Sequence, residues 1–228
     1  MTARVVIAHP KKVGRRHGCC PMTAPHSTLR QRLEGLNLYL VGMMGAGKSA
    51  VGRPLADALG YRFVDADTVL EGAAGRTIPE IFARDGEAEF RQLETAVLGQ
   101  ISGWHSLVVA TGGGVVTRPE NWGHMRQGVV VWLDAPAQLL LTRLGSDTTP
   151  RPLLQVDDPG SRLRQLLAER QPLYAQADLH VCQRQEQPPQ VAQLVLEALP
   201  GILRARPEAP LHPALLQNQG GEITTSLN

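Results

Sequence analysis

The chain has 228 residues and a net charge of +2, with 43% of its residues hydrophobic and 19% charged. This balance is typical of a globular protein with a sizeable core, and no stretch reaches the apolar length of a membrane span. The net charge is uninformative about nucleic acid, but no basic stripe with interleaved aromatic residues is present, which argues against a nucleic-acid-binding protein. The three cysteines, Cys19, Cys20 and Cys182, have neither disulfide nor metal spacing, as expected in a reducing compartment.

The first residues form a basic segment. It carries seven Lys or Arg residues and no acidic residue before Glu34. It also lacks the apolar core of a secretory signal. A transit peptide would be similarly basic and poor in acids, but the segment contains a single serine, Ser27, and translation could instead start at Met22. We therefore expect residues 1–35 to be a disordered extension rather than a plastid-targeting signal.

Strand and helix patterns alternate from residue 36 to residue 203. Short apolar runs predict strands over residues 37–41, 62–65, 107–110, 129–133 and 179–182. Helix patterns cover residues 48–59, 78–83, 87–102, 119–126, 136–144, 161–176 and 189–199. Buried strands separated by helices predict a single α/β domain with a central five-stranded parallel sheet and helices on both faces. Residues 204–228 mix Pro, Gln, Gly and Thr without periodicity, and we expect a disordered tail there.

A phosphate-binding loop follows the first predicted strand. Residues 42–49 read Gly-Met-Met-Gly-Ala-Gly-Lys-Ser and lie between a strand and a helix, as this motif requires. The glycines allow backbone N–H groups to surround phosphate oxygens at the positive end of the helix. Lys48 would reach the β- and γ-phosphates, and the Ser49 hydroxyl would bind Mg²⁺. Glycine-rich turns precede many helices, but the Lys-Ser pair in this position predicts a nucleoside triphosphate site.

Two carboxylates, Asp65 and Asp67, close the second predicted strand. Residues two apart on a strand point to the same face, so both side chains could enter one site beside the phosphate loop. One could hold Mg²⁺, directly or through water, while the other accepts a hydrogen bond from a substrate hydroxyl. The alternative is that both acids are solvated and cap the next helix, a position for which Asp is well suited.

Three glycines, Gly112, Gly113 and Gly114, follow the third predicted strand. Successive glycines cost conformational entropy unless the backbone has to approach something closely. In parallel sheets, ligands bind beyond the carboxyl ends of the strands. We therefore predict that this turn presents backbone N–H groups to a ligand.

Three arginines complete the pattern. The planar guanidinium groups of Arg91 and Arg170 suit bidentate binding of a carboxylate, although each, taken alone, fits a solvated helix surface better. Arg151 lies in a polar, proline-flanked segment between two predicted helices. This composition is typical of a mobile cover, and an arginine on such a lid could move onto a transferring phosphoryl group as the lid closes.

Together these motifs resemble the shikimate kinase family. They read, in order, Gly-Met-Met-Gly-Ala-Gly-Lys-Ser, Asp-Ala-Asp, Ile-Phe-Ala-Arg-Asp-Gly-Glu-Ala-Glu-Phe-Arg-Gln-Leu-Glu, Thr-Gly-Gly-Gly, Arg-Pro-Leu-Leu and Glu-Arg-Gln-Pro-Leu-Tyr. The resemblance runs from about Leu36 to Leu199. Many families share the phosphate loop, whereas Phe-Arg-x-x-Glu, the triple glycine and Arg-x-Pro-Leu-Tyr are much more specific.

The resemblance implies a P-loop kinase fold, with a substrate-binding helical segment at about residues 67–95 and a lid at about residues 145–158. It implies transfer of the γ-phosphoryl group of MgATP to the 3-hydroxyl of shikimate, a step of aromatic amino-acid biosynthesis. We expect the enzyme to be cytoplasmic, without a nucleic-acid or membrane partner. No apolar heptad suggests obligate assembly, so we also expect a monomer.

The resemblance also assigns roles to individual residues. The catalytic residues match Asp67, Lys48 and Arg151, with Asp67 as the favoured base. The ATP-binding residues match Gly42, Gly45, Ala46, Gly47, Lys48, Ser49, Ala50, Arg143 and Arg151, with Arg143 against the adenine. The shikimate-binding residues match Asp67, Arg91, Glu94, Gly112, Gly113, Gly114 and Arg170. The two arginines Arg91 and Arg170 would hold the substrate carboxylate, with Glu94 steadying an arginine. Mg²⁺ would be bound by Ser49 directly and by Asp65 through water. Ala50 stands where the family commonly has Thr.

Two other functions fit the phosphate loop. The first is a related P-loop kinase that acts on gluconate, a nucleoside or a nucleotide, although such an enzyme has no need of two arginines beside Asp67. The second is a non-catalytic binding protein that has kept the kinase fold. Such a protein should have lost Lys48, Asp67 or one of the arginines, all of which this chain retains. Fold alone does not distinguish these functions.

Overall fold

A computed structural model describes residues 24–146 and 151–203 of the chain. Its centre is a parallel sheet of five strands: β1 (Leu38–Val41), β2 (Arg62–Asp65), β3 (Leu107–Ala110), β4 (Val129–Asp134) and β5 (Leu179–Cys182). The strands lie in the order β2-β3-β1-β4-β5, so β1 is central and β5 lies at one edge. The predicted five-stranded parallel sheet is therefore confirmed, and each predicted strand agrees with the structure to within one residue.

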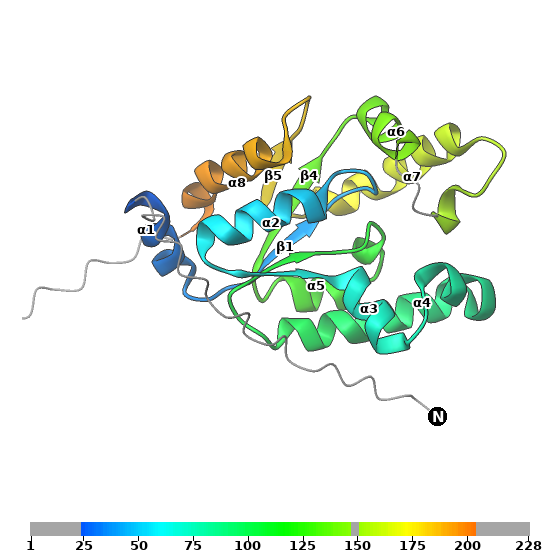
Figure 1. The fold of residues 1–228 in the computed structure, drawn as a ribbon, viewed down its shortest axis with the longest axis horizontal. Coiled ribbons are helices and arrows are strands. Elements are labelled where there is room, and N and C mark those ends of the chain that lie inside the picture. Colours follow the sequence, from blue (N-terminus) through cyan, green and yellow to red (C-terminus); the bar gives the residue numbers. More distant parts are fainter. Residues whose placement is uncertain (1–23, 147–150, 204–228) are drawn as a thin grey trace, which may run out of the picture.

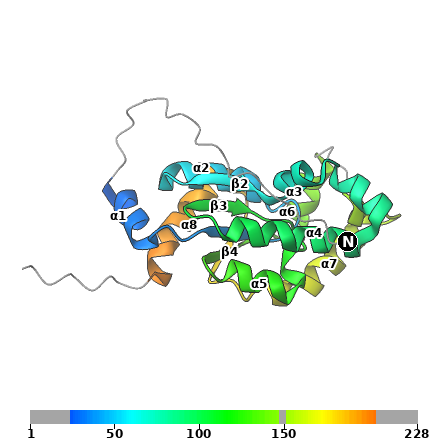
Figure 2. The same cartoon turned by 90° about the horizontal axis from the view of Figure 1, so that it is seen from below.

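Helices cover both faces of the sheet, as predicted. In the described part of the chain they are α1 (Ala24–Leu33), α2 (Lys48–Leu59), α3 (Ala66–Ala74), α4 (Ile78–Ser102), α5 (Pro119–Met125), α6 (Ala137–Gly145), α7 (Pro159–Tyr174) and α8 (Pro188–Ile202). Figure 1 shows α2 and α8 on one side of the sheet and α4 and α5 on the other, and Figure 2 shows the same layers from below. None of the helices within residues 24–146 and 151–203 is long and apolar enough to cross a membrane.

The central strand shows how one short apolar sequence supplies two cores. Side chains alternate along a strand, so Leu38 and Leu40 point to one face and Tyr39 and Val41 to the other. The first pair belongs to the core beneath α2 and α8, and the second pair to the core beneath α4 and α5. All four residues are completely buried. A strand without alternating polarity therefore marks a sheet that is covered on both faces.

Helix α1 corrects one expectation. Of the segment at residues 1–35 that is expected to be a disordered extension, residues 24–33 form a helix. Residues 1–23 and the expected C-terminal tail at residues 204–228 lie outside the described residues. Leu29 and Leu33 lie four residues apart on one helical face, and both are buried in the core that contains α2 and α8. Arg32 donates hydrogen bonds to the carbonyl oxygens of Pro200 (3.0 Å) and Leu203 (2.6 Å) at the end of α8. Two buried leucines and a capping arginine thus hold this segment in a helix, although its basic composition resembles that of an unstructured tail.

Helix α4 confirms the prediction of two helical segments at residues 78–83 and 87–102. Its residues form one element with a sharp bend at Gly86, whose backbone has φ 80° and ψ 175°. A left-handed φ of this kind favours glycine. The rings of Phe82 and Phe90 meet across the bend, with centroids 4.7 Å apart. The bend places the first half of α4 beside the carboxyl ends of the strands, where the candidate site lies (Figure 1).

Candidate active site

The phosphate loop has the geometry that its sequence predicts. It joins β1 to α2, and Gly42, Gly45 and Gly47 all have positive φ angles, of 142°, 81° and 81°. A Cβ atom on Gly42 would lie 2.5 Å from the carbonyl oxygen of Leu133, so the loop requires glycine there for space as well as for conformation. The loop thus packs closely against the end of β4.

Lys48 folds back over this loop. Its ammonium donates hydrogen bonds to the carbonyl oxygens of Gly42 (2.8 Å) and Met43 (3.1 Å). Burial, partly opposed by the nearby Asp67 carboxylate, lowers the pKa of Lys48 to about 8. At neutral pH the side chain is therefore still mostly cationic, as a phosphate ligand has to be.

Asp65 and Asp67 both reach the site, but by a different route from the one expected. The expectation that both lie on one strand face is wrong, because β2 ends at Asp65 and Asp67 lies in the first turn of α3. Asp65 caps this helix and accepts hydrogen bonds from the backbone N–H groups of Asp67 (3.1 Å) and Thr68 (3.3 Å). It also accepts a hydrogen bond of 2.5 Å from the Ser49 hydroxyl. Capping and a role at the phosphate loop, first considered as alternatives, therefore coexist in Asp65.

A polar cavity of about 300 Å³ opens above the loop. Its lining combines the phosphate loop with the ends of β2 and β3: Met44, Gly45, Gly47, Lys48, Ser49, Ala50, Asp65, Asp67, Thr111, Gly113, Arg143, Leu144 and Arg151. Gly42 and Ala46, two of the expected ATP-binding residues, are buried and do not line the cavity. They contribute to the buried packing of the loop and not to the surface of the cavity. We call this space the donor cavity.

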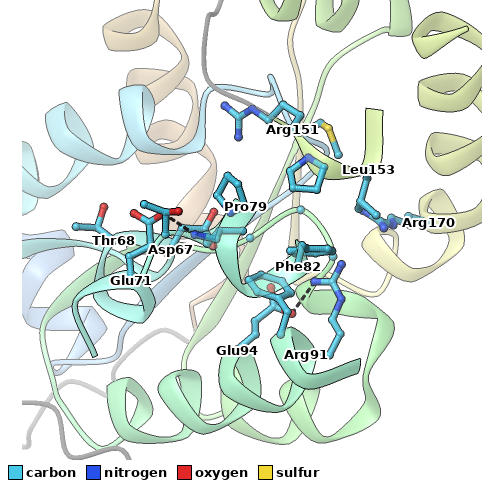
Figure 3. Close-up of a pocket in the computed structure, with 18 residues that line it drawn as sticks. Asp67, Thr68, Glu71, Pro79, Phe82, Arg91, Glu94, Arg151, Leu153 and Arg170 are labelled. Carbon is cyan, nitrogen blue, oxygen red and sulfur yellow. Dashed lines mark hydrogen bonds and ion pairs between the residues drawn. The ribbon is translucent and has the colours of Figure 1, made fainter. Parts of the chain in front are cut away.

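A second cavity of about 520 Å³ adjoins it. Figure 3 shows its main side chains, which come from α3, both halves of α4, the segment that begins at Arg151, and α7. The triple-glycine turn lines it with backbone. It is lined by Met44, Asp67, Thr68, Glu71, Thr77, Ile78, Pro79, Phe82, Phe90, Arg91, Glu94, Gly112, Gly113, Gly114, Arg151, Pro152, Leu153 and Arg170. Met44, Asp67, Gly113 and Arg151 line both cavities. We call this second space the acceptor cavity.

Arg91 is fixed on one wall of the acceptor cavity by two carboxylates. It donates hydrogen bonds to Glu94 (2.8 Å) and to Glu87 (3.0 Å), as the dashed line to Glu94 in Figure 3 shows. Glu94 is only 5% exposed, and burial raises the pKa of its carboxyl group in spite of the adjacent Arg91. The second carboxylate oxygen of Glu94, Oε1, has no hydrogen-bond partner among the described residues. Glu94 thus orients Arg91 and still has an acceptor atom available.

The triple glycine makes room for these side chains. A Cβ atom on Gly112 would lie 2.5 Å from Glu94 Oε1 and 3.1 Å from Asp67 Oδ1. A Cβ atom on Gly114 would overlap the guanidinium group of Arg91. The backbone of this turn was expected to approach a ligand, and the structure shows that it first has to approach the side chains that surround the cavity. This crowding explains the glycines at positions 112 and 114, while a Cβ atom on Gly113 would lie 3.2 Å from the backbone nitrogen of Met44 in the phosphate loop.

Arg170, on α7, also lines the acceptor cavity. It is 5% exposed, and its Nη1 atom has no hydrogen-bond partner among the described residues. One turn further along α7, the buried Tyr174 donates a 2.5 Å hydrogen bond to the carbonyl oxygen of Gly113, and burial raises the pKa of Tyr174 to about 12. This hydrogen bond ties α7, and with it Arg170, to the glycine turn.

Asp67 lies where the two cavities meet. Burial, reinforced by the carboxylates of Asp65 and Glu94, raises the pKa of Asp67 to about 6. The side chain is therefore ionised at neutral pH, yet it accepts a proton more readily than an ordinary aspartate. A carboxylate with these properties at the boundary of a phosphate site fits a general base.

Comparison with known proteins agrees with this geometry. Residues 44–200 match the family model described as shikimate kinase. This chain belongs to the shikimate kinase family. The shikimate kinase of Synechococcus sp. (strain RCC307) is 60% identical over 188 residues, which span 82% of this chain and 96% of that protein. The shikimate kinase of Synechococcus sp. (strain CC9605) is 60% identical over 177 residues, 78% of this chain and 89% of that protein.

Solved structures give the same result. The shikimate kinase from Acinetobacter baumannii in complex with shikimate is 42% identical, has a TM-score of 0.72, and the match covers 76% of this chain and 97% of that one. The shikimate kinase from Aquifex aeolicus is 35% identical with a TM-score of 0.65, over 73% of this chain and 97% of that one. This family member is accordingly an ATP-dependent phosphotransferase with a P-loop kinase fold.

The structure also reveals a positioning residue that the sequence did not indicate. Gln183 is 3% exposed, donates a 2.9 Å hydrogen bond to the carbonyl oxygen of Ala46 and accepts one of 3.1 Å from Arg143. Arg143 also donates to the carbonyl oxygen of Gly45 at 3.3 Å. A cavity of about 380 Å³ beside Gly47 is lined by both Gln183 and Arg143. Gln183 lies in a polar segment, so nothing in its sequence context predicts a buried contact with the phosphate loop.

The apolar part of the acceptor cavity falls within the predicted substrate-binding segment and lid, but its individual residues were not predicted. Ile78, Pro79, Phe82 and Leu153 line it, and Figure 3 shows the last three. Their sequence patterns are those of ordinary helix and core positions, and only the bend in α4 brings its first half over the site. Residues 147–150 of the expected lid lie outside the described residues. Arg151 and the short 3₁₀ turn Pro152–Leu154 are described, and all of them except Leu154 line the acceptor cavity.

Proposed function

We propose that this protein transfers the γ-phosphoryl group of MgATP to the 3-hydroxyl of shikimate, giving shikimate 3-phosphate and ADP. One observation carries the proposal: a phosphate-loop cavity and a cavity flanked by two arginines meet at a single carboxylate, Asp67. An enzyme that phosphorylates a small hydroxylated carboxylate needs this arrangement. The shikimate bound to the Acinetobacter relative supports the choice of acceptor.

On the donor side, the triphosphate would occupy the donor cavity. The N–H groups of the phosphate loop and the start of α2 would surround its oxygens, since the N-terminus of a helix carries partial positive charge. Lys48 and Arg151 both line this cavity and would neutralise charge on the phosphates. The neighbouring cavity of about 380 Å³ beside Arg143 would take the nucleoside, with the guanidinium group stacked against the base.

The donor set beside the loop fits Mg²⁺. The Ser49 hydroxyl and the Asp65 carboxylate are hard oxygen ligands that lie 2.5 Å apart, at the point where the donor cavity receives phosphate. Ser49 would bind the ion directly and Asp65 through water. The ion held there would supply charge neutralisation for the transferring phosphates.

On the acceptor side, Arg91 from α4 and Arg170 from α7, which both line the acceptor cavity, would hold the substrate carboxylate. Glu94 keeps Arg91 in position through its 2.8 Å hydrogen bond. Asp67 and the backbone of Gly113 would bind ring hydroxyls, because both line the acceptor cavity next to the donor side. Two guanidinium groups on one carboxylate fix the direction of the ring, and this presents one hydroxyl to the phosphate.

The chemical step then requires little from the protein beyond position and charge. The 3-hydroxyl oxygen attacks the γ-phosphorus, the bond between that phosphorus and the β,γ-bridging oxygen breaks, and the hydroxyl proton passes to Asp67. The raised pKa of Asp67 makes it a suitable acceptor for this proton. Lys48 and Arg151 stabilise the charge that gathers on the departing ADP.

A coupled ATPase assay tests the proposal. Purified full-length protein with MgATP is given shikimate, gluconate or a nucleoside monophosphate, and ADP release is compared with the rate without an acceptor. We expect rapid ADP release with shikimate and background rates with the other two. Preference for gluconate or a nucleotide would overturn the proposed acceptor, and ATP binding without turnover on any acceptor would indicate a non-catalytic binding protein.

A further inference from the structure

A cluster of three metal-ligating side chains lies outside both cavities. Asp134 is the last residue of β4, and His180 and Cys182 lie on the neighbouring edge strand, β5. His180 Nε2 is 2.9 Å from Asp134 Oδ2 and 3.4 Å from Cys182 Sγ, and all three ligand atoms lie within 4.8 Å of one another. None of these residues lines a cavity assigned above to nucleotide or shikimate.

Strand pairing brings the three residues together. In the parallel ladder, Asp134 is opposite Cys182 and Trp132 is opposite His180. Side chains alternate along a strand, so these four residues share one face of the sheet. The cysteine and histidine are two residues apart, while the aspartate is more than forty residues away in the sequence. For this reason the spacing of the cysteines along the chain gives no sign of the cluster.

The imidazole ring is held in position by packing. It stacks on Trp132, with ring centroids 4.0 Å apart and an angle of 7° between the planes. Trp132 itself is 4% exposed. The ring of His180 therefore lies on a rigid, buried surface, and its Nε2 atom points toward the other two ligands. The ligands themselves remain open to solvent on one side, because His180 and Cys182 are exposed.

The geometry distinguishes a cation site from a catalytic cysteine–histidine pair. A relay would use the two ring nitrogens separately, one toward the cysteine and one toward the carboxylate. Here both neighbours approach the same nitrogen, Nε2. A ring nitrogen carries at most one hydrogen, so it cannot satisfy a carboxylate and a thiolate equally. A single divalent cation at the centre can be shared by all three atoms.

We propose that Asp134, His180 and Cys182 form a binding site for a zinc-class divalent cation, with water as the fourth ligand. Tetrahedral zinc with ordinary bond lengths places its nitrogen ligand about 3.3–3.5 Å from its oxygen and sulfur ligands. The observed 2.9 and 3.4 Å lie close to these values, and the Asp134 and Cys182 ligand atoms lie within 4.8 Å of each other. The thiolate disfavours Mg²⁺ and Ca²⁺, which prefer oxygen ligands, so this site is chemically separate from the Mg²⁺ site beside the phosphate loop.

Cobalt spectroscopy tests the site, because thiolate-bound Co²⁺ gives an intense near-ultraviolet charge-transfer band. The full chain is reduced, freed of metal and titrated with Co²⁺ in the absence of nucleotide, and Zn²⁺ is then added as a competitor. The sequence also contains Cys19 and Cys20, so the titration uses a parent in which both are replaced by Ser. We expect one equivalent of Co²⁺ to produce the band and one equivalent of Zn²⁺ to remove it.

Three variants of that parent complete the test. Cys182→Ser should abolish the band, and His180→Asn should weaken Zn²⁺ binding by at least about 100-fold, since even outer-shell changes can cost 10- to 100-fold. His105→Asn is the matched control, because His105 is an exposed histidine far from the cluster in sequence. This variant should keep the cobalt band and the Zn²⁺ affinity of the parent. Shikimate kinase activity with MgATP verifies that each variant folds. The proposal is overturned if the parent shows no stoichiometric band, or if Cys182→Ser and His180→Asn bind Zn²⁺ as the parent does.

Discussion

The donor and acceptor cavities share a wall but are built in different ways. On the donor side, backbone geometry dominates. The loop needs glycine at position 42, and Lys48 donates hydrogen bonds to two of the loop's own carbonyl oxygens. On the acceptor side, side chains dominate, and they come from α3, α4 and α7. Glu94 Oε1 and Arg170 Nη1, both buried around this cavity, lack hydrogen-bond partners among the described residues.

This difference separates the two recognition problems. A phosphate group is common to many substrates, and a loop of backbone N–H groups suffices to bind it. A particular hydroxylated carboxylate has to be distinguished from others, which requires charged side chains at fixed positions and buried polar atoms that only the correct ligand satisfies. Changes on the donor side should therefore act mainly through the fold of the loop, and changes on the acceptor side mainly through the choice of substrate.

The largest effect is expected at the boundary. Asp67→Asn removes the proposed base while preserving the shape of the side chain, so turnover with shikimate should fall by about 10²- to 10⁴-fold. Because the phosphate loop is unaltered, calorimetric titration should give ATP binding close to that of the unmodified protein. If the variant kept most of its turnover, Asp67 would be a structural acid only.

The next effect contrasts the two sets of glycines. Gly42→Ala would force a side chain into left-handed backbone and against the carbonyl oxygen of Leu133, which cannot move without shifting β4. We expect a loss of about 2–4 kcal/mol in the free energy of unfolding, from the strained backbone and the overlap together. Denaturant unfolding followed by circular dichroism measures this loss.

A smaller effect is expected at Gly112, where the added Cβ meets the end of the Glu94 side chain rather than backbone. Gly112→Ala should cost about 1–2 kcal/mol of stability, and its KM for shikimate should rise more than its KM for ATP. Gly123→Ala in α5 is the control, because nothing lies within 4 Å of its Cβ position. That change should stabilise the helix by about 0.5–1 kcal/mol. Equal losses at Gly42 and Gly112 would contradict the contrast between the two cavities.

The smallest effect concerns pH. The pKa of Asp67 is raised to about 6 in the folded protein, so the folded state holds this proton more tightly than the unfolded state. Its contribution to stability is present at low pH and is lost as the pH rises through 6. In the absence of ligands, the Asp67→Asn variant lacks this pH dependence. The free energy of unfolding of the variant minus that of the unmodified protein should therefore increase by about 1–1.5 kcal/mol from about pH 5 to about pH 7.5. Unfolding curves at the two pH values measure the change, and no difference between them would mean that Asp67 titrates like an exposed aspartate.

Where local rules decide the structure, the sequence was sufficient. The phosphate loop, the five strands and the break in α4 at Gly86 follow from apolar runs and glycine positions. Where packing decides, the sequence misled or gave no signal. Asp67 lies on a helix because Asp65 ends β2 and caps α3, and the period-two reasoning could not detect that change of structure.

The same distinction applies outside the site. Helix α1 is stable because Leu29 and Leu33 reach the core, which a basic composition does not reveal. Gln183 reaches Arg143 and the loop only after β5 has joined the sheet. The Asp134, His180 and Cys182 cluster likewise depends on the pairing of two strands. Such contacts join distant parts of the chain, so they emerge from the fold and not from any single segment.

The most direct test of the central claim is the kinetic effect of Arg170→Ala, a change confined to the acceptor cavity. Loss of the Arg170 guanidinium group should leave the substrate carboxylate poorly paired, at a cost of about 2–5 kcal/mol in binding free energy. KM for shikimate should therefore rise by about 30-fold or more. KM for ATP should stay within about two-fold, which corresponds to less than about 0.5 kcal/mol. Equal increases in the two KM values would contradict the claim, because they would show that the two cavities do not separate donor from acceptor.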